Sequence, residues 1–389
     1  MPQTTQFDPM RNADGLAGQF TFGVEIEMNI PTAFWNAHSI TLNSYHSTRY
    51  ALPSSLRPVR DGLNDSHVIS GEWTVQSDVS IHGGRGRGAE LVSPVLRGTA
   101  GLREVIDVLT RMHEGGCRSN SSCGIHVHIG FGEMFGGRKY DDVYNIIRRL
   151  INLVSEHEHA LVAIGGNPDR IRAVAGGWAQ TIKNDGNLVT HHTGTARKSK
   201  LERIGRGIKK SSLIWDGHHR IQRDITPSMK KLRQHAPLGH RVGLNLENLF
   251  ASKRTVEFRY FRGSTHPIKV VGIIMVALGL CSRAAQTTIC RKFNPSVSLP
   301  EGKTWADAVD SLHSILNWAY IKDSWAKGAV RYGDATGSDF WNEFGKRILK
   351  NQRWNAKRFI QLANRGRSPH HRSARQGTFN LYERITYTS

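Results

Sequence analysis

Four segments of the chain alternate apolar and polar residues, and each carries two polar side chains separated by a single residue. In the first segment, Ile26 separates Glu25 from Glu27, and apolar residues flank both acids. Successive side chains of a strand point to opposite faces, so both acids should lie on one face and their apolar neighbours on the other. The pattern recurs in three further pairs: Asp78 and Ser80, His126 and His128, and Glu257 and Arg259. The sequence therefore predicts a sheet with one apolar and one charged face.

The charged face needs compensation if it is to be buried. Two carboxylates one strand step apart repel each other unless a cation lies between them, and burying several such groups is costly without a metal ion and an anionic ligand. Carboxylate oxygens are the ligands that Mg²⁺ prefers, and a histidine nitrogen can join a second or third ion. We interpret the face as a divalent-metal and nucleotide site. The expected metal ligands are Glu25, Glu27, Glu90 and Glu257, with His126 or His128, and Arg259 should reach a phosphate oxygen.

Positive charge dominates the composition of the chain. Its 389 residues include 53 Lys and Arg against 32 Asp and Glu, a formal net charge of +21. Such a protein attracts polyanions whether or not they are substrates, so charge alone does not separate nucleotide, nucleic-acid and acidic-polymer partners. Basic residues crowd into residues 183–240, which we interpret either as a solvated basic face or as a cover over anionic substrates. Residues 346–382 contain no acid, which favours nonspecific polyanion attraction or no role for the tail.

Cysteine usage and hydropathy indicate a soluble, cytoplasmic protein without a membrane segment. The four cysteines are too sparse for a disulfide scaffold and lack zinc-site spacing, so free thiols are expected. Residues 1–19 have no apolar core of the secretory type. The most apolar stretch, residues 270–281, is about half the roughly 20 residues that a bilayer-spanning helix needs.

The order of the expected elements indicates one α+β unit. The hydrophobic patterns predict strands over 20–30, 72–81, 89–95, 124–131, 242–246 and 255–261. They predict helices over 102–112, 141–164, 267–287, 305–319, 339–349 and 354–363. We expect an N-terminal extension over 1–14, a catalytic domain over 15–365 that contains the basic segment 183–240, and a basic tail over 366–389.

Four motifs, in this order, resemble those of the amidoligase family, whose fold is related to glutamate-cysteine ligase and glutamine synthetase. They are GVEIE at 23–27, ELVSPVL at 90–96, CGIHVHIG at 123–130 and TVEFRYFRG at 255–263. The resemblance covers roughly residues 20 to 285. It implies a curved, largely antiparallel sheet whose concave face forms a funnel, with helices on the convex side.

The resemblance also implies a reaction and a set of site residues. The reaction is ATP-dependent ligation of a carboxylate, glutamate-like by analogy, to an amine through an acyl phosphate, with two or three Mg²⁺ ions or with Mn²⁺. The amine acceptor could be a small metabolite, a peptide or a group linked to a polyanion or nucleic acid. Glu25, Glu27, Glu90, Glu257 and one histidine of the His126 and His128 pair match the family's metal ligands. Glu257, Arg259 and Arg241 are the expected catalytic residues, and Arg259, Asn245 and Arg262 the expected nucleotide contacts, whereas Trp73 and Asp78 match the family less closely.

Plainer interpretations stand beside these. The acids of the first strand could be solvated on a sheet edge, the histidines could be hydrogen-bonded within the sheet, and Glu257 with Arg259 could be a simple ion pair. The glycine-rich segment 83–88 lacks the Lys-Ser/Thr that follows a phosphate-binding loop, so a hairpin is favoured there. Two other function classes remain open: a basic nucleic-acid-binding protein without catalysis, and a metal-dependent phosphodiesterase.

Overall fold

The computed structural model describes residues 20–42, 48–60, 67–82, 84, 86–120, 122–131, 140–165 and 243–286. Their strands are β1 (Thr21–Ile30), β2 (Tyr50–Ala51), β3 (Val68–Ser70), β4 (Thr74–Ser77), β5 (Arg87–Val92), β6 (Val95–Leu96), β7 (Gly124–Gly130), β8 (Leu244–Asn245) and β9 (Thr255–Arg262). Their helices are α2 (Thr32–Ala37), α3 (Gly98–Glu114), α5 (Tyr140–Gly165) and α8 (Pro267–Gln286), with short 3₁₀ turns at Ser54–Leu56 and Glu247–Phe250. The expected α+β class is confirmed.

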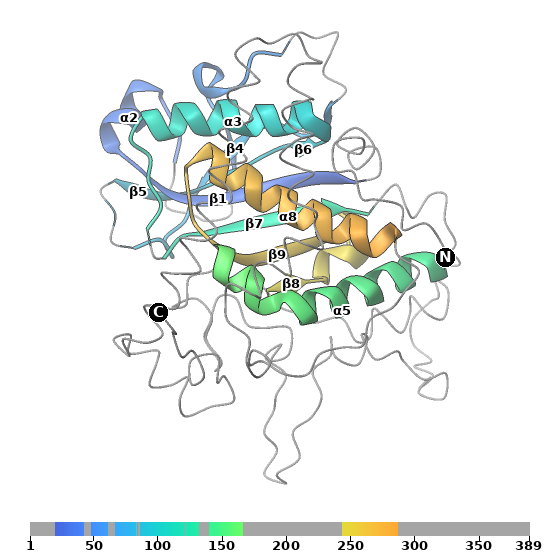
Figure 1. The fold of residues 1–389 in the computed structure, drawn as a ribbon. Coiled ribbons are helices and arrows are strands. Elements are labelled where there is room, and N and C mark those ends of the chain that lie inside the picture. The colour runs from blue at the N-terminus through green and yellow to red at the C-terminus, as the bar shows by residue number, and fades with distance from the viewer. Residues whose placement is uncertain are drawn as a thin grey trace, which may run out of the picture.

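One open sheet of nine strands organises these residues. The strand order is β2-β4-β5-β1-β7-β9-β8, and β6 pairs with both β1 and β3. Every pair is antiparallel. The long strand β1 lies near the middle of the sheet, between β5 and β7, and its apolar side chains are buried. Figure 1 shows this sheet behind its helices.

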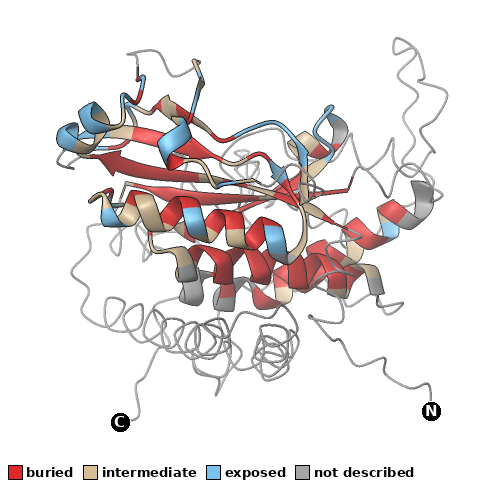
Figure 2. Cartoon of the chain, turned by 90° about the horizontal axis from the view of Figure 1, so that it is seen from above, coloured by how far each residue is buried: buried red, intermediate tan, exposed pale blue. Residues whose placement is uncertain are grey.

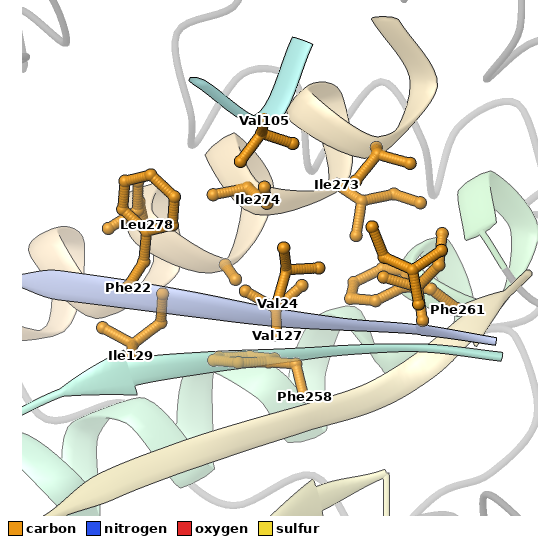
Figure 3. Close-up of a cluster of buried hydrophobic side chains, with 14 of the residues drawn as sticks. Phe22, Val24, Val105, Val127, Ile129, Phe258, Phe261, Ile273, Ile274 and Leu278 are labelled. Atoms are coloured by element: carbon orange, nitrogen blue, oxygen red, sulfur yellow. The ribbon is translucent and has the colours of Figure 1, made fainter. Parts of the chain in front are cut away.

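The three long helices cover one face of the sheet. Figures 1 and 2 show α3, α5 and α8 on the same side, and α8 packs against both other helices and against β1 and β7. Apolar residues recur along α3 at helical spacing, and α8 is buried along nearly all of its described length. Val24 and Val127 point from the sheet toward Ile274 of α8 in Figure 3. The apolar half of the alternating pattern therefore forms the core, and its polar half faces away from the helices.

A buried carboxylate fixes the segment around β3 to α3. Glu104 of α3 is 3% exposed and accepts hydrogen bonds from three side chains of that segment. The indole Nε1 of Trp73 donates to its Oε1 at 2.7 Å, His67 Nε2 lies 2.8 Å from its Oε2, and Arg60 Nη2 lies 2.5 Å from its Oε1. Both carboxylate oxygens of Glu104 therefore hold this segment against α3.

Several expected boundaries differ from the structure. The strand expected over 72–81 ends at Ser77, because Asp78 Oδ1 accepts a hydrogen bond from the backbone N–H of Ser80 at 2.8 Å and turns the chain. The pair Asp78 and Ser80 thus lies in a turn, and the prediction of a fourth alternating strand was wrong there. The strand expected over 89–95 is divided into β5 and β6, and α2 was not predicted.

Other predictions are confirmed or lie outside the described residues. β4 and β5 form the hairpin favoured for the glycine-rich segment between them. Cys117 and Cys281 are buried free thiols, and Cys123 is also buried. Within the described part of the chain, no helix combines the length and the hydropathy needed to cross a membrane. The basic segment 183–240, the helices expected over 305–319, 339–349 and 354–363, and both terminal extensions lie outside the described residues.

Candidate active site

The polar face of the sheet gathers the predicted site residues from five strands. Strand alternation brings Glu25 and Glu27 of β1 to the face opposite the helices, and the register places Glu25 beside His126 and Glu27 beside Glu90. The next pairing places His128 beside Glu257, and β8 adds Asn245 beside Glu257. Eight side chains lie together there, and we call them the carboxylate–histidine cluster: Glu25, Glu27, Glu90, His126, His128, Asn245, Glu257 and Arg259.

His126 lies at the centre of the carboxylate–histidine cluster. Its Nδ1 lies 3.3 Å from Glu25 Oε2 and 3.7 Å from Glu257 Oε1, and its Nε2 lies 3.5 Å from Glu27 Oε1. His128 Nε2 lies 3.4 Å from Glu25 Oε1 and 4.0 Å from Glu257 Oε1. Two sets of three side chains each bring potential ligand atoms within 4.8 Å of one another: Glu25, His126 and Glu257, and Glu27, Glu90 and His126. His126 belongs to both sets and could bridge them or serve either.

Hydrogen bonds from outside the two sets fix the orientation of the carboxylates. The backbone N–H of Gly124 donates to Glu27 Oε2 at 2.6 Å, and the amide of Gln76 donates to Glu90 Oε2 at 2.5 Å. The amide of Asn245 donates to Glu257 Oε2 at 2.9 Å. Each of these three acids is thereby held through one oxygen, which leaves the other oxygen for the interior of the cluster. Such outer partners hold a metal-binding side chain in position before an ion arrives.

Arg259 enters the cluster at an irregularity of β9. The register between β7 and β9 shifts between Ile125 and Val127, next to His126. Arg259 shares the face of Glu257 by strand alternation. It donates to Glu257 and lies within 3.4 Å of His126 Nδ1 through the same Nη1 atom. The guanidinium therefore lies against the first set of ligands, where a phosphate oxygen would meet both the arginine and an ion.

The acids differ in their protonation. Burial by itself would raise the pKa of Glu25, but hydrogen bonds and charge interactions with His126 and His128 hold it well below its usual range. Burial likewise opposes ionisation of Glu257, and the charges of Arg259 and both histidines lower its pKa overall. Burial, together with the charges of Glu25 and Glu27, raises the pKa of Glu90 to about 8. One acid of the cluster is thus protonated at neutral pH, as expected for crowded carboxylates without a cation.

The geometry of the cluster fits divalent ions with oxygen ligands. An octahedral ion whose ligands lie at about 2.1 Å places adjacent ligand atoms about 3 Å apart. The nitrogen-to-oxygen distances of 3.3 and 3.5 Å around His126 are only slightly longer. In addition, the buried Arg259 Nε makes no hydrogen bond with any described residue. Carboxylates with one or two imidazoles suit Mg²⁺ or Mn²⁺.

The structure brings together most, but not all, of the predicted site residues. Arg262 lies at the end of β9, opposite Gly124 in the register, and is not one of the side chains of the cluster. Its charge acts on Lys269 of α8, and burial together with this arginine lowers the pKa of Lys269 to about 8. Trp73 lies in the core and donates to Glu104, so it is no part of the site. Asp78 contributes only its charge, which helps to raise the pKa of Glu90. Arg241 lies outside the described residues.

Three contributors were missed by the sequence analysis. Gln76 follows the alternation of β4 and could have been found from it, but an amide is a weak signal for a metal site. Arg49 precedes the two-residue strand β2 and reaches over β4 and β5: its Nε donates to Gln76 at 3.0 Å and its Nη2 lies 3.8 Å from Glu25. The Gly124 N–H is a backbone group without any signal in residue type.

A pocket of about 650 Å³ adjoins the cluster at Glu25 and His128. Its floor is the first half of β1. Its walls come from the β3–β4 and β5–β6 connections, from the end of β7 and from the start of β9. Gly23, Thr74, Val92 and Thr255 line it together with the charged residues Arg49 and Lys253. The arrangement can hold divalent ions at the cluster and an organic molecule beside them.

Comparisons with known proteins give a family and distant solved structures. The model of a family described as "Putative amidoligase enzyme" matches residues 19–281, more than half of the chain. A comparison with curated protein sequences finds no match. Among solved structures, the chain is similar to the crystal structure of a bifunctional glutathione synthetase from Pasteurella multocida, with 10% identity and a TM-score of 0.39. That alignment covers 97% of this chain and 54% of the other, and a TM-score this low does not establish a shared fold.

Proposed function

Because the chain belongs to the amidoligase family, we propose that it is an ATP- and Mg²⁺-dependent ligase that joins a carboxylate to an amine. The observation that carries the proposal is the convergence of Glu25, Glu27, Glu90 and Glu257 around His126 on the face of the sheet opposite α3, α5 and α8. A buried group of acids at this density needs cations, and cations in turn attract a triphosphate.

The proposed reaction has two steps. A carboxylate oxygen of the acid substrate attacks the terminal phosphorus of ATP, and ADP leaves with the electron pair of the broken P–O bond. An amine nitrogen then attacks the carbonyl carbon of the acyl phosphate, the C–O bond to phosphate breaks, and the nitrogen loses a proton. Phosphoryl transfer of this kind depends on positioning and charge stabilisation more than on covalent chemistry by the protein.

The residues of the chain have separate roles in this proposal. The two ligand sets around His126 would hold two of the two or three divalent ions expected, either Mg²⁺ or Mn²⁺, and bound ions would neutralise charge on the phosphate oxygens. Arg259 holds a guanidinium beside Glu257, where it can donate to an oxygen of the transferred phosphoryl group. Asn245 and Gly124 keep Glu257 and Glu27 oriented before substrates bind.

The family relationship supports two further parts of the proposal. The sheet is taken to be of the glutamate-cysteine ligase and glutamine synthetase type, with the helix-covered face convex and the carboxylate–histidine cluster on the concave face. A glutamate-like acid is the proposed first substrate. The amine could be a metabolite, a peptide or a group linked to a polyanion, in keeping with the net charge of +21.

Trapping the acyl phosphate tests the ligase proposal. Protein, ATP and Mg²⁺ are incubated with a panel of carboxylic acids and hydroxylamine, a strong nucleophile that converts acyl phosphates to hydroxamates. We expect ADP and hydroxamate in equal amounts, only when acid, hydroxylamine and metal are all present. Phosphodiester cleavage without ATP would instead support a metal-dependent phosphodiesterase, and nucleic-acid binding without any turnover would support the non-catalytic alternative.

A further inference from the structure

The pocket beside the carboxylate–histidine cluster has apolar walls and a glycine in its floor. Val92 and Pro94 are buried lining residues, and Val95 is 37% exposed. Gly23 alternates with Val24 and so faces the pocket side of β1, opposite His128 in the register. A Cβ added at Gly23 would meet only ordinary contacts, with Ser93 Oγ at 3.7 Å and Pro94 O at 3.8 Å. The pocket therefore offers an apolar channel along β1 that a larger side chain at position 23 would fill.

Two cations, Arg49 and Lys253, line the pocket, whereas its two acids are already paired with other side chains. Glu25 pairs with both His126 and His128, and Glu72 forms an ion pair with Arg57 at 3.0 Å. Arg49 keeps its side chain 42% exposed while it reaches toward Glu25. Lys253 is exposed, and no ion pair or hydrogen bond of its side chain occurs among the residues that the structure describes.

The two cations flank the pocket from opposite sides of β1. Arg49 adjoins β2, which pairs with β4, whereas Lys253 precedes β9, which pairs with β7. In the strand order, β5 and β1 lie between these two sides. A molecule in the pocket can therefore meet one cation at each side, with its middle against Val92 and the open floor at Gly23.

We propose that this pocket is the subsite of the acid substrate, and that it takes an aliphatic carboxylic acid with a second anionic group. The proposal rests on the ligase function proposed above and adds where the acid lies and what it must carry. The carboxylate to be phosphorylated lies at the Glu25 end of the pocket, next to Arg49 and the ligand set of His126. The aliphatic stem packs on Val92 and Val95, and the second anionic group pairs with Lys253.

Binding of simple diacids to four variants tests this subsite. The probes are succinate, glutarate and adipate, which differ only in stem length, and butyrate, which lacks the second anion; calorimetry measures each with Mg²⁺ present. Gly23→Leu fills the pocket, and Gly23→Ala is its matched control because one methyl group fits there. Lys253→Met removes the proposed partner of the second anion, and Arg254→Met removes a neighbouring exposed cation that does not line the pocket.

We expect at least one diacid to bind the unmodified protein more tightly than butyrate. Gly23→Leu should abolish diacid binding, and Lys253→Met should weaken it about tenfold or more, as loss of a charge-assisted contact predicts. Gly23→Ala and Arg254→Met should bind as the unmodified protein does, and butyrate should not respond to Lys253→Met. ATP affinity, measured in parallel, should be unchanged in all four variants.

Three results would overturn the assignment. Failure of every diacid to bind, or diacid affinity that is the same in Gly23→Leu, removes the acid from this pocket even if ATP turnover is present. Loss of ATP affinity in Gly23→Leu assigns the pocket to the nucleotide. If diacids respond as expected but the unmodified protein binds no ATP, the ligase function fails and the pocket remains only a diacid site.

Discussion

At the scale of single residues, the site depends on acids that are held in different protonation states by their neighbours. Glu25 and Glu257 share the histidines and have lowered pKa values despite burial, whereas Glu90 lies beside two other acids and has a raised one. The pKa shifts thus favour the ionised form of Glu25 and Glu257 and the protonated form of Glu90. A divalent ion bound at Glu27, Glu90 and His126 would displace that proton.

Replacing Glu257 by Gln should abolish turnover while preserving the fold. The amide keeps the shape of the side chain and can still accept from Asn245, but it loses the negative charge that faces His126 and Arg259. Because even outer-shell partners of a metal contribute about 10- to 100-fold, loss of a ligand should lower kcat/KM by at least about 100-fold. ADP release measures the effect, and Glu114→Gln on the exposed end of α3 is the control. An active Glu257→Gln protein would remove this residue from the site.

The raised pKa of Glu90 predicts how the metal-free protein responds to pH. Its folded-state pKa of about 8 lies above the ordinary 4.5, so the folded state retains a proton that the unfolded chain releases. This stabilisation is complete below about pH 4.5 and is lost as the pH rises through about 8. Since one pKa unit corresponds to about 1.4 kcal/mol, the free energy of unfolding should fall by a few kcal/mol over this window.

Urea unfolding in EDTA between about pH 5 and 8 measures this decline. Glu90→Gln cannot titrate and should show a flatter profile, and Mg²⁺ should restore stability at the alkaline end because it binds the ionised acid. Equal slopes in the two proteins would show that Glu90 ionises freely in the folded state.

At the scale of elements, the sequence predicts the faces of the strands but not their neighbours. The alternation around Glu25 and around His126 correctly separates the polar from the apolar side, because both patterns run through long central strands. The order β5-β1-β7-β9, which brings Glu90, His126 and Glu257 around β1, depends on pairings between segments up to more than a hundred residues apart. Local pattern carries no information on such pairings.

Each error of the sequence analysis has a specific structural cause. Asp78 alternates with Val79 and Ser80 as strand residues do, but its carboxylate accepts from the Ser80 N–H, and this turn competes with strand pairing. Arg262 belongs to the same motif as Arg259, but it lies beyond the register shift of β9, opposite Gly124, and its charge acts on Lys269 of α8. Arg49 and Glu104 were missed because each acts on partners remote in sequence.

Glu104 should contribute to stability through the segment that it holds against α3. Glu104→Gln leaves Arg60 and His67 without their anionic partner and turns one of the two acceptor oxygens into a donor that faces other donors. Breaking such a buried interaction is expected to cost about 3–5 kcal/mol of the free energy of unfolding. Chemical denaturation measures the loss, with Asp107→Asn, an exposed acid one turn further along α3, as a control expected to change little. A loss no larger than that of the control would show that the network is dispensable.

At the scale of the whole molecule, the net charge of +21 and the buried cluster predict two different responses to salt. Exposed basic residues bind nucleic acid by releasing counterions, so affinity for a random DNA duplex should fall roughly 10- to 1000-fold between 50 and 200 mM salt. Interactions among buried groups are screened much less, and ATP turnover should change far less over the same range. Parallel titrations of DNA binding and ADP release separate the two. Turnover that collapses together with DNA binding would indicate that catalysis depends on a nucleic-acid partner.

The central claim is that the carboxylate–histidine cluster binds divalent ions beneath a nucleotide triphosphate. The most direct test is anomalous diffraction from crystals soaked with Mn²⁺ and a nonhydrolysable ATP analogue. We expect manganese peaks within about 2.2 Å of ligand atoms from Glu25, His126 and Glu257 or from Glu27, Glu90 and His126, with phosphate oxygens beside Arg259. Manganese and phosphates bound elsewhere, with these side chains unchanged, would contradict the account.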